Sequence, residues 1–275
     1  MTHGPSGANR LFGAAGEALA GPVDAHVHLY TNDLPMVAGR RYTPATAATL
    51  AMLADRLRAG GLAGALVVQP SFLGTDNARL LACLAAAARD CADLTLRGVA
   101  VLDPATPADE MARLAAAGIA GLRLNLVGGA ALPDLAQPVW QRHLAAANDL
   151  GWHVELHLES PRLPALLPAL LDACAHLVVD HFGRPDPVQG LACPGIRALL
   201  AAPADRITVK LSAPYRSFPT LSSDEAAAYC IPFAQALADR FGRDRLAWGS
   251  DWPWTQFEDR HSYAQALAWR DLWFP

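Results

Sequence analysis

The sequence has few charged residues and lacks a surplus of basic ones. Asp, Glu, Lys and Arg make up 17% of the 275 residues, with 22 basic side chains, 26 acidic ones and a formal net charge of −4. A protein that binds nucleic acid needs a clear basic excess to meet the phosphate backbone. The charge balance therefore gives no reason to expect a nucleic-acid partner.

Long apolar runs are also missing. No segment approaches the ~20 consecutive apolar residues that a membrane-spanning helix needs, so we expect no membrane partner. Residues 1–21 are rich in Gly and Ala, but they lack the basic start and the uninterrupted apolar stretch of a signal peptide. We predict that they form a flexible N-terminal arm.

Cysteine is scarce, and its number is odd. The five cysteines include no Cys-x-x-Cys pair, which argues against a disulfide framework and against the usual cysteine-based metal motifs. This usage is typical of reduced, mostly packed thiols in the cytoplasm, where we expect the protein to be located.

The sequence does contain a repeated alternation of two kinds of segment. Eight short β-type runs lie at residues 23–29, 65–69, 94–102, 121–126, 153–158, 177–181, 207–211 and 246–250. Ala/Leu-rich segments with helical spacing lie between them, at residues 45–59, 77–88, 108–117, 138–150, 162–173, 195–202 and 224–241. Eight strand–helix units predict an α/β protein with the (β/α)₈ TIM-barrel fold, and the chain length is near the ~250 residues typical of that fold.

An open doubly wound sheet is the alternative architecture. It would carry a Gly-rich phosphate loop after its first strand, and residues 23–30 contain no such loop. No linker rich in Pro, Gly or Ser divides the chain, so we predict one domain over residues 22–275. The sequence stops shortly after the eighth strand, and we therefore expect the eighth helix to be short or incomplete.

Two histidines at the end of the first strand are the first candidate site residues. His26 and His28 are two positions apart, so in a strand they point to the same side. Two imidazoles at that spacing can chelate one cation. A pair of hydrogen-bonded polar residues at the barrel end is the alternative interpretation.

Other strand ends carry similar residues. His157 ends the fifth predicted strand, His181 the sixth, and Asp251 follows the eighth. Parallel barrel strands deliver their carboxyl ends to one face, where catalytic loops lie. His153 and Glu155 share the parity of His157, and we choose His157 because it is nearest the strand end. Together these residues predict a functional site on one rim.

Three arginines form a second group at the same face. Arg123 lies in the fourth strand, Arg184 follows His181, and Arg216 follows the seventh strand. A charge inside a barrel strand is costly unless it is paired. Converging guanidinium groups fit a carboxylate well and favour an anionic substrate. Salt bridges to acidic residues at the rim are the alternative interpretation.

These strand-end motifs resemble the amidohydrolase superfamily, over roughly residues 22–269. The superfamily markers are His26-Val27-His28, His157, His181 and Asp251. Narrower markers resemble the amidohydrolase-related branch that contains 2-pyrone-4,6-dicarboxylate lactonase and sulfomuconolactone hydrolase. They are Gln69-Pro70-Ser71 with Asn77, Gly121-Leu122-Arg123, His181-Phe182-Gly183-Arg184, Lys210-Leu211-Ser212-Ala213-Pro214-Tyr215-Arg216 and Gly249-Ser250-Asp251-Trp252-Pro253, together with Arg41-Tyr42-Thr43-Pro44.

The sequence departs from the dicarboxylate lactonase at two places. That enzyme carries a second arginine shortly after its strand-four arginine, whereas residues 126–130 here contain no basic residue. We therefore expect lactones with one acid group to be handled better than those with two. That lactonase also works without metal and has tyrosine at the end of strand five, where His157 stands here, so the substitution favours a metal site.

The resemblance implies a hydrolase that opens a lactone bearing an anionic group. One divalent ion, zinc by preference, would be bound by His26, His28 and His157, with Asp251 as a ligand or nearby. Asp251 would take the proton from the attacking water and pass it to the leaving alkoxide. His181 would donate to the carbonyl oxygen. The substrate contacts would be Arg123, Arg184, Arg216, Tyr42, Ser71 and Asn77.

Three alternatives remain at this stage. A metal-free version of the hydrolysis would let Asp251 activate water directly. Non-oxidative decarboxylation on similar ligands is a second enzymatic reaction that the superfamily supports. A barrel that binds an anionic metabolite without turnover is the non-catalytic alternative. The sequence leaves the oligomeric state open.

Overall fold

The computed structural model describes residue 19 and residues 21–274, so the predicted N-terminal arm lies almost wholly outside the described residues. Eight parallel strands are joined in the order β1 to β8, each to the next. They are β1 (Val23–Val27), β2 (Gly64–Val68), β3 (Thr95–Ala100), β4 (Ile119–Asn125), β5 (His153–His157), β6 (Leu177–Val179), β7 (Ile207–Leu211) and β8 (Leu246–Trp248). The backbone of Asp251 donates to His26 O and that of His28 to Trp252 O, which brings the two ends of the sheet together. The fold is a (β/α)₈ TIM barrel, as predicted.

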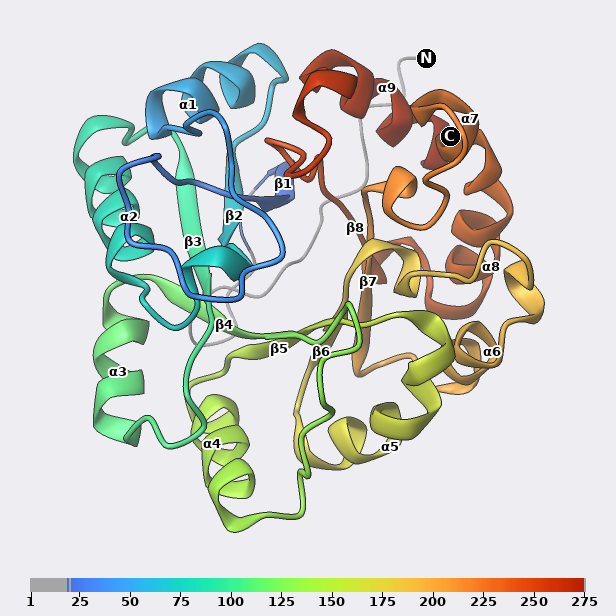
Figure 1. Ribbon diagram of the computed structural model, residues 1–275, viewed down its shortest axis with the longest axis horizontal. Helices are drawn as coiled ribbons and strands as arrows, with labels where there is room; N and C mark the ends of the chain where they lie inside the picture. The colour runs from blue at the N-terminus through green and yellow to red at the C-terminus, as the bar shows by residue number, and fades with distance from the viewer. Residues whose placement is uncertain (1–18, 20, 275) are drawn as a thin grey trace.

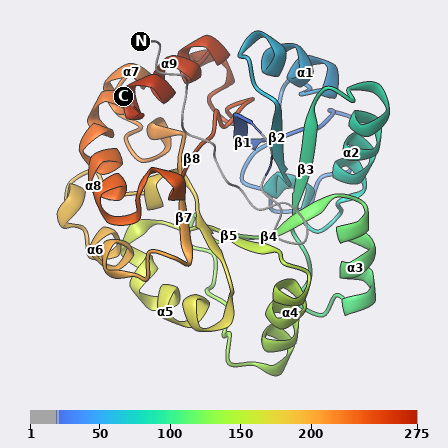
Figure 2. The same cartoon turned by 180° about the vertical axis from the view of Figure 1, so that it is seen from behind.

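The helices form a ring outside the strands, as both views of the ribbon show (Figures 1 and 2). They are α1 (Leu50–Ala59), α2 (Ala78–Asp90), α3 (Ala108–Ala116), α4 (Pro138–Asp149), α5 (Leu163–Ala173), α6 (Pro194–Ala201), α7 (Ser223–Tyr229), α8 (Ile231–Phe241) and α9 (Tyr263–Trp273). Buried apolar residues of the helices and strands pack between the ring and the barrel. No helix within residues 21–274 combines the length and apolar character required to cross a bilayer.

Two predicted helices differ from the observed ones. The segment predicted to begin at residue 45 becomes helical only at Leu50, because Ala48 pairs with Tyr30 in an antiparallel bridge. The segment 224–241 is two helices, α7 and α8, separated at Cys230. Pro232 explains the break, since proline has no N–H to donate and its ring collides with the carbonyl four residues earlier.

The expectation that the eighth helix is short is wrong. The last helix, α9, has eleven residues, as many as α5 and α8. Ser262 caps its start by accepting a hydrogen bond from Gln265 N. Trp248 of β8 donates from Nε1 to Ala266 O at 3.2 Å, so this helix covers the end of the sheet that lies next to β1.

Candidate active site

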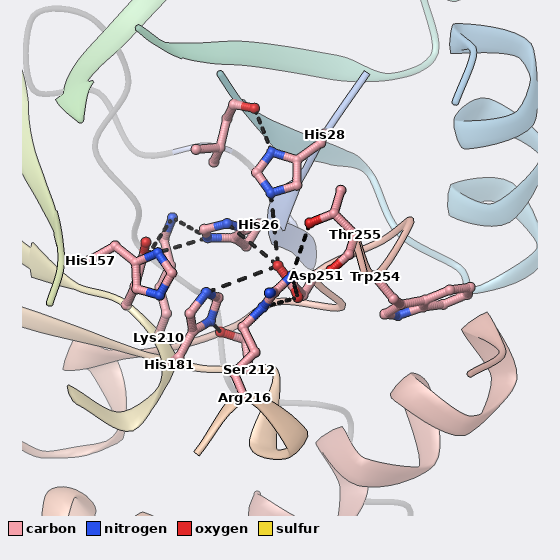
Figure 3. A network of polar contacts seen from close by, with 12 residues as sticks. His26, His28, His157, His181, Lys210, Ser212, Arg216, Asp251, Trp254 and Thr255 are labelled. Carbon is pink, nitrogen blue, oxygen red and sulfur yellow. Dashed lines mark hydrogen bonds and ion pairs between the residues drawn. The ribbon is translucent and has the colours of Figure 1, made fainter. Parts of the chain in front are cut away.

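The loops at the carboxyl ends of the strands enclose a cavity of about 260 Å³. The predicted site residues that line it are His28, Tyr42, Ser71, Arg123, His157, His181, Arg184, Arg216 and Asp251. His26 is fully buried beside them, and its ring centroid lies 5.1 Å from that of His28 and 4.8 Å from that of His181. The parity and strand-end arguments therefore located one common site, as Figure 3 shows.

One oxygen of Asp251 faces three imidazoles (Figure 3). Its Oδ1 lies 3.7, 3.8 and 4.0 Å from the Nε2 atoms of His26, His28 and His181. Oδ1 and the Nε2 atoms of His26 and His181 are buried and have no hydrogen-bond partner among the described residues. Buried polar atoms without partners are costly, and a cation is the natural common partner for a carboxylate oxygen and imidazole nitrogens.

The opposite nitrogen of each ring is held in place. Nδ1 of His28 lies 2.7 Å from the carbonyl oxygen of the last β2 residue and donates to it. Nδ1 of His181 lies 2.7 Å from Oγ of Ser212, and Nδ1 of His26 lies 3.3 Å from Oδ1 of Asp180. Such partners fix the orientation of a histidine ring, so that its Nε2 points into the site.

The second oxygen of Asp251 is fully engaged. Oδ2 accepts hydrogen bonds from Tyr215 OH at 2.5 Å and from Arg216 Nε at 2.7 Å. Burial alone would raise the pKa of Asp251, but the positive charge of Arg216 is the largest of the opposing influences that hold the pKa below its usual value. Asp251 is therefore a carboxylate at neutral pH. Its Oδ2 is hydrogen-bonded to Tyr215 and Arg216, and its buried Oδ1 faces the cavity.

The histidines of the site are neutral at pH 7. Burial, and after it the neighbouring Arg123, lower the pKa of His28 to about 4. Burial likewise lowers the pKa values of His26, His157 and His181 well below the usual value. Neutral imidazoles can act as metal ligands or as hydrogen-bond donors and acceptors, whereas imidazolium ions cannot bind a metal.

Two of these residues have a backbone conformation that side chains rarely adopt. The φ angles of His181 and Asp251 are 53° and 59°. Residues other than glycine in this left-handed region carry local strain, which surrounding structure must hold, and they cluster at functional sites. The conformation turns both side chains inward at the point where each strand has ended.

His157 is engaged differently from the prediction. Its Nε2 lies 3.1 Å from Arg184 Nη1 and its Nδ1 lies 3.5 Å from Arg123 Nη2. The groups of potential ligand atoms within residues 21–274 are His26, His28 and Asp251, and His26, Asp180 and His181. Neither group contains His157, whose two nitrogens lie beside guanidinium groups, and we do not include it in the metal site proposed below.

A layer of buried charged residues lies beneath the histidines, and we did not predict it from the sequence. Lys210, the only lysine of the chain, is fully buried and bonds to the carboxylate of Glu155. Its Nζ also lies 3.2 Å from Nδ1 of His26 and 3.5 Å from Oδ1 of Asp180. The presence of charged residues inside predicted barrel strands could have indicated this layer, because such residues need partners of opposite sign.

The three predicted arginines are not equivalent. Arg123 donates to Gln69 O at 3.0 Å and pairs with Asp180 at 3.4 Å. Arg216 is the partner of Asp251, so the rim salt bridge that was the alternative interpretation applies to both. Arg184 donates to Arg216 O at 2.8 Å, and no carboxylate lies within 4.0 Å of its guanidinium group among the described residues.

The other three predicted substrate contacts, Tyr42, Ser71 and Asn77, also differ in where their side chains lie. Tyr42 and Ser71 line the cavity. Asn77 does not line it, and its side-chain amide is already used: Nδ2 donates to Thr75 O and Val101 O, and Oδ1 accepts from Val101 N. Asn77 ties the loop after β2 to the end of β3, so we no longer assign it a substrate contact.

The fold is a TIM barrel, and histidine and aspartate side chains lie together on its carboxyl rim. This combination is typical of one class of hydrolases. The profile of the amidohydrolase family matches residues 23–275, and the chain belongs to this family. It is 33% identical over 253 residues to the 2-pyrone-4,6-dicarboxylate hydrolase of Comamonas testosteroni, an alignment that covers 87% of this chain and 79% of that protein. The enzyme is thus a hydrolase of the amidohydrolase superfamily.

Two further relatives agree with this assignment. The 4-sulfomuconolactone hydrolase of Rhizobium radiobacter is 27% identical over 245 residues, covering 87% of this chain and 78% of that protein. A crystal structure of a probable 2-pyrone-4,6-dicarboxylic acid hydrolase from Acinetobacter baumannii, with citric acid bound, superposes with a TM-score of 0.85 at 32% identity. That superposition covers 93% of each chain.

Proposed function

We propose that this enzyme hydrolyses a lactone that carries an anionic group, with water activated at the barrel mouth by Asp251. The observation that carries the proposal is the buried Asp251 carboxylate, which faces neutral histidines in a cavity lined by arginines. The names of the relatives support lactones as the substrate class. The bound citric acid of the Acinetobacter baumannii protein supports an anionic ligand in this fold.

We include one divalent ion in the proposal, with zinc as the first choice. His26, His28 and Asp251 offer two imidazole nitrogens and a carboxylate oxygen within 4.8 Å of one another, and zinc takes such donors. When bound, a divalent ion supplies Lewis-acid activation of water at neutral pH.

Asp251 serves as the general base. Its Oδ1 accepts a proton from water as the water oxygen bonds to the lactone carbonyl carbon, and it returns that proton to the ring oxygen as the carbon–oxygen bond breaks. Tyr215 and Arg216 hold the carboxylate through Oδ2, so Oδ1 stays aimed at the cavity. The product is the ring-opened hydroxy acid or its keto tautomer.

His181 serves as the donor to the carbonyl oxygen. In the tautomer we propose, the Ser212 hydroxyl donates to Nδ1 of His181, which places the imidazole proton on Nε2. That proton can stabilise the negative charge that develops on the carbonyl oxygen. Burial lowers the pKa of His181 well below the usual value, so near neutral pH the ring is neutral and carries a single proton.

A lactone panel with two readouts tests the proposal. Ring opening releases one proton per turnover and no carbon dioxide, whereas decarboxylation releases carbon dioxide. We expect proton release by the wild-type enzyme and a loss of roughly a hundred- to ten-thousandfold in kcat for Asp251→Asn, which is the range that general-base catalysis contributes. Release of carbon dioxide would transfer support to the decarboxylase, and binding without either product would support a binding protein.

The free cysteines fit our expectation of a reducing compartment. All five are buried and unpaired by disulfides. Burial raises the pKa of the Cys174 thiol to about 12, so this thiol has little thiolate character. We retain the cytoplasm as the proposed location, and fractionation of cells that express the protein is the test.

A further inference from the structure

The cavity carries more positive charge than its carboxylates neutralise. Four arginines line it, Arg41, Arg123, Arg184 and Arg216, together with two carboxylates, Glu159 and Asp251. Asp251 is already paired with Arg216. Glu159 is bound to Arg162, outside the cavity lining, and to the backbone N–H of Gly128.

Arg41 is the arginine that the sequence did not single out. It lies between β1 and α1, and its Nη1 donates to Val127 O at 2.9 Å while its Nη2 donates to Asn125 Oδ1 at 3.2 Å. Within residues 21–274 no carboxylate lies within 4.0 Å of its guanidinium group. It remains a cation at neutral pH, although burial and then the charge of Arg123 lower its pKa.

Gly128 lies against the side chain of Arg41. This glycine has a φ of +73°, and a Cβ added to it would lie 3.1 Å from Nη1 and 3.2 Å from Cδ of Arg41. The loop after β4 has no basic residue of its own. Because Gly128 has no side chain, the guanidinium group of a residue from another loop can lie close to its backbone. Arg41 thus occupies the side of the cavity where the sequence appeared to lack a cation.

The two arginines without carboxylate partners are held on different loops. Arg184, after β6, is fixed by Arg216 O and by Nε2 of His157. Arg41 is fixed by the loop after β4. A backbone carbonyl accepts a hydrogen bond from each guanidinium group, and each presents its charge at its own side of the cavity.

We propose that Arg41 is a specificity-determining residue that binds a second anionic group of the substrate, while Arg184 binds the first. This inference rests on the proposed function and reverses the expectation that lactones with one acid group are handled better. A guanidinium that lies beside other cations at a cavity wall is stabilised by an anion that joins it. A lactone with two acid groups supplies one anion to each unpaired arginine.

Binding of two non-reactive aromatic acids tests Arg41 without relying on turnover. Isophthalate has two carboxylates in a 1,3 relation and benzoate has one; calorimetry gives the Kd of each. We expect Arg41→Met to weaken isophthalate binding about ten- to a hundredfold, as for loss of one charge-assisted contact, and to change benzoate binding less than about twofold. Arg41→Gln is the second neutral variant, in case Arg41→Met does not fold.

Arg40→Met is the matched control. Arg40 is the preceding residue and is exposed, and its guanidinium bonds to Thr43 and Val37 O without lining the cavity. We expect it to leave both Kd values unchanged. Equal losses for isophthalate and benzoate in Arg41→Met, or no loss for either, would overturn the inference.

The kinetic form of the experiment separates this inference from the proposed function. For the lactone pair 2-pyrone-4,6-dicarboxylate and 2-pyrone-6-carboxylate, Arg41→Met should lower kcat/KM about ten- to a hundredfold for the diacid alone. If both lactones are hydrolysed and Arg41→Met affects them alike, the inference fails while the function stands. If no lactone is hydrolysed but isophthalate binding depends on Arg41, the function fails while the second anion site stands.

Discussion

At the scale of single residues, the site depends on which atom of each polar side chain remains free. Asp251 keeps Oδ1 towards the cavity because Tyr215 and Arg216 occupy Oδ2. His181 keeps Nε2 towards the cavity because Ser212 occupies Nδ1. The chemistry that we propose therefore depends on residues that never touch the substrate but decide which oxygen or nitrogen does.

The Ser212 hydroxyl gives the first prediction. Ser212→Ala removes the partner of His181 Nδ1 and lets the imidazole take either tautomer, so kcat should fall about tenfold, equivalent to one lost hydrogen bond. KM should change little because Ser212 does not line the cavity. Ser217→Ala, on the same loop, is the control variant. An unchanged kcat in Ser212→Ala would remove the support for His181 as the proton donor.

At the scale of the elements, a balanced set of buried charges lies in β4, β5 and β7 and directly after β6. Lys210 and Arg123 carry positive charge, and Glu155 and Asp180 carry negative charge. Burial alone would raise the pKa of Glu155, and the Asp180 charge adds to this, yet Lys210 and neighbouring donors hold it below its usual value. The balance of two and two is what makes a charged barrel interior tolerable.

Removing the lysine gives the second prediction. Lys210→Met leaves carboxylates buried with too little positive charge, so the free energy of unfolding should fall by about 3–5 kcal/mol. Urea denaturation followed by fluorescence measures it. The double variant Lys210→Met/Glu155→Leu removes one charge of each sign and should recover part of the loss. No recovery would mean that the lysine acts through packing alone.

At the scale of the whole molecule, the barrel brings ligand atoms from its two sequence ends together. His26 and His28 come from β1 and Asp251 follows β8. A metal that binds this group only in the folded protein would stabilise the entire domain, because the ligands are assembled only when the barrel closes.

Metal binding gives the third prediction. Protein stripped with a chelator should have a lower Tm, and zinc at a hundredfold over its Kd should restore about 2.7 kcal/mol, or several degrees. Elemental analysis of protein purified without chelator measures occupancy. His28→Asn should lose the zinc-dependent shift. Full activity in metal-free protein, unchanged by added zinc, would transfer support to the metal-free hydrolysis.

Neutral buried histidines give the fourth prediction. Burial lowers the pKa values of His28 and His261 to about 4, below the 6.5 of an unfolded histidine. A depressed pKa means that protonation favours the unfolded chain, so stability should be lost as pH falls from about 6.5 to 4. Asp24 has the opposite effect on stability, because burial raises its pKa to about 6. The histidines with lowered pKa values outnumber it, so their effect should prevail.

A single variant tests the sign of this pH dependence. His261 stacks on Tyr215 with 4.1 Å between ring centroids. His261→Phe keeps an aromatic ring there but has no nitrogen to titrate. Its midpoint of urea denaturation should therefore fall less steeply than that of the wild type between pH 6.5 and 4. A steeper fall would contradict the assignment of a depressed pKa to His261.

The sequence by itself determined the eight strand–helix units and the strand-end positions of the site. Local periodicity sets which segments become strands, and alternation along a strand sets that His26 and His28 share one side. The common rim of a parallel barrel then places His157, His181 and Asp251 with them. These inferences need no knowledge of distant contacts, and the predicted barrel is confirmed.

Only the tertiary structure decided which charges meet. Lys210 lies 184 residues from His26 and 55 from Glu155 in the chain, and Arg41 bonds to a carbonyl 86 residues away. No local pattern encodes such pairs, because they form when separate strands and loops close around one axis. The same closure paired Arg123 and Arg216 with carboxylates and left Arg41 and Arg184 free for an anion.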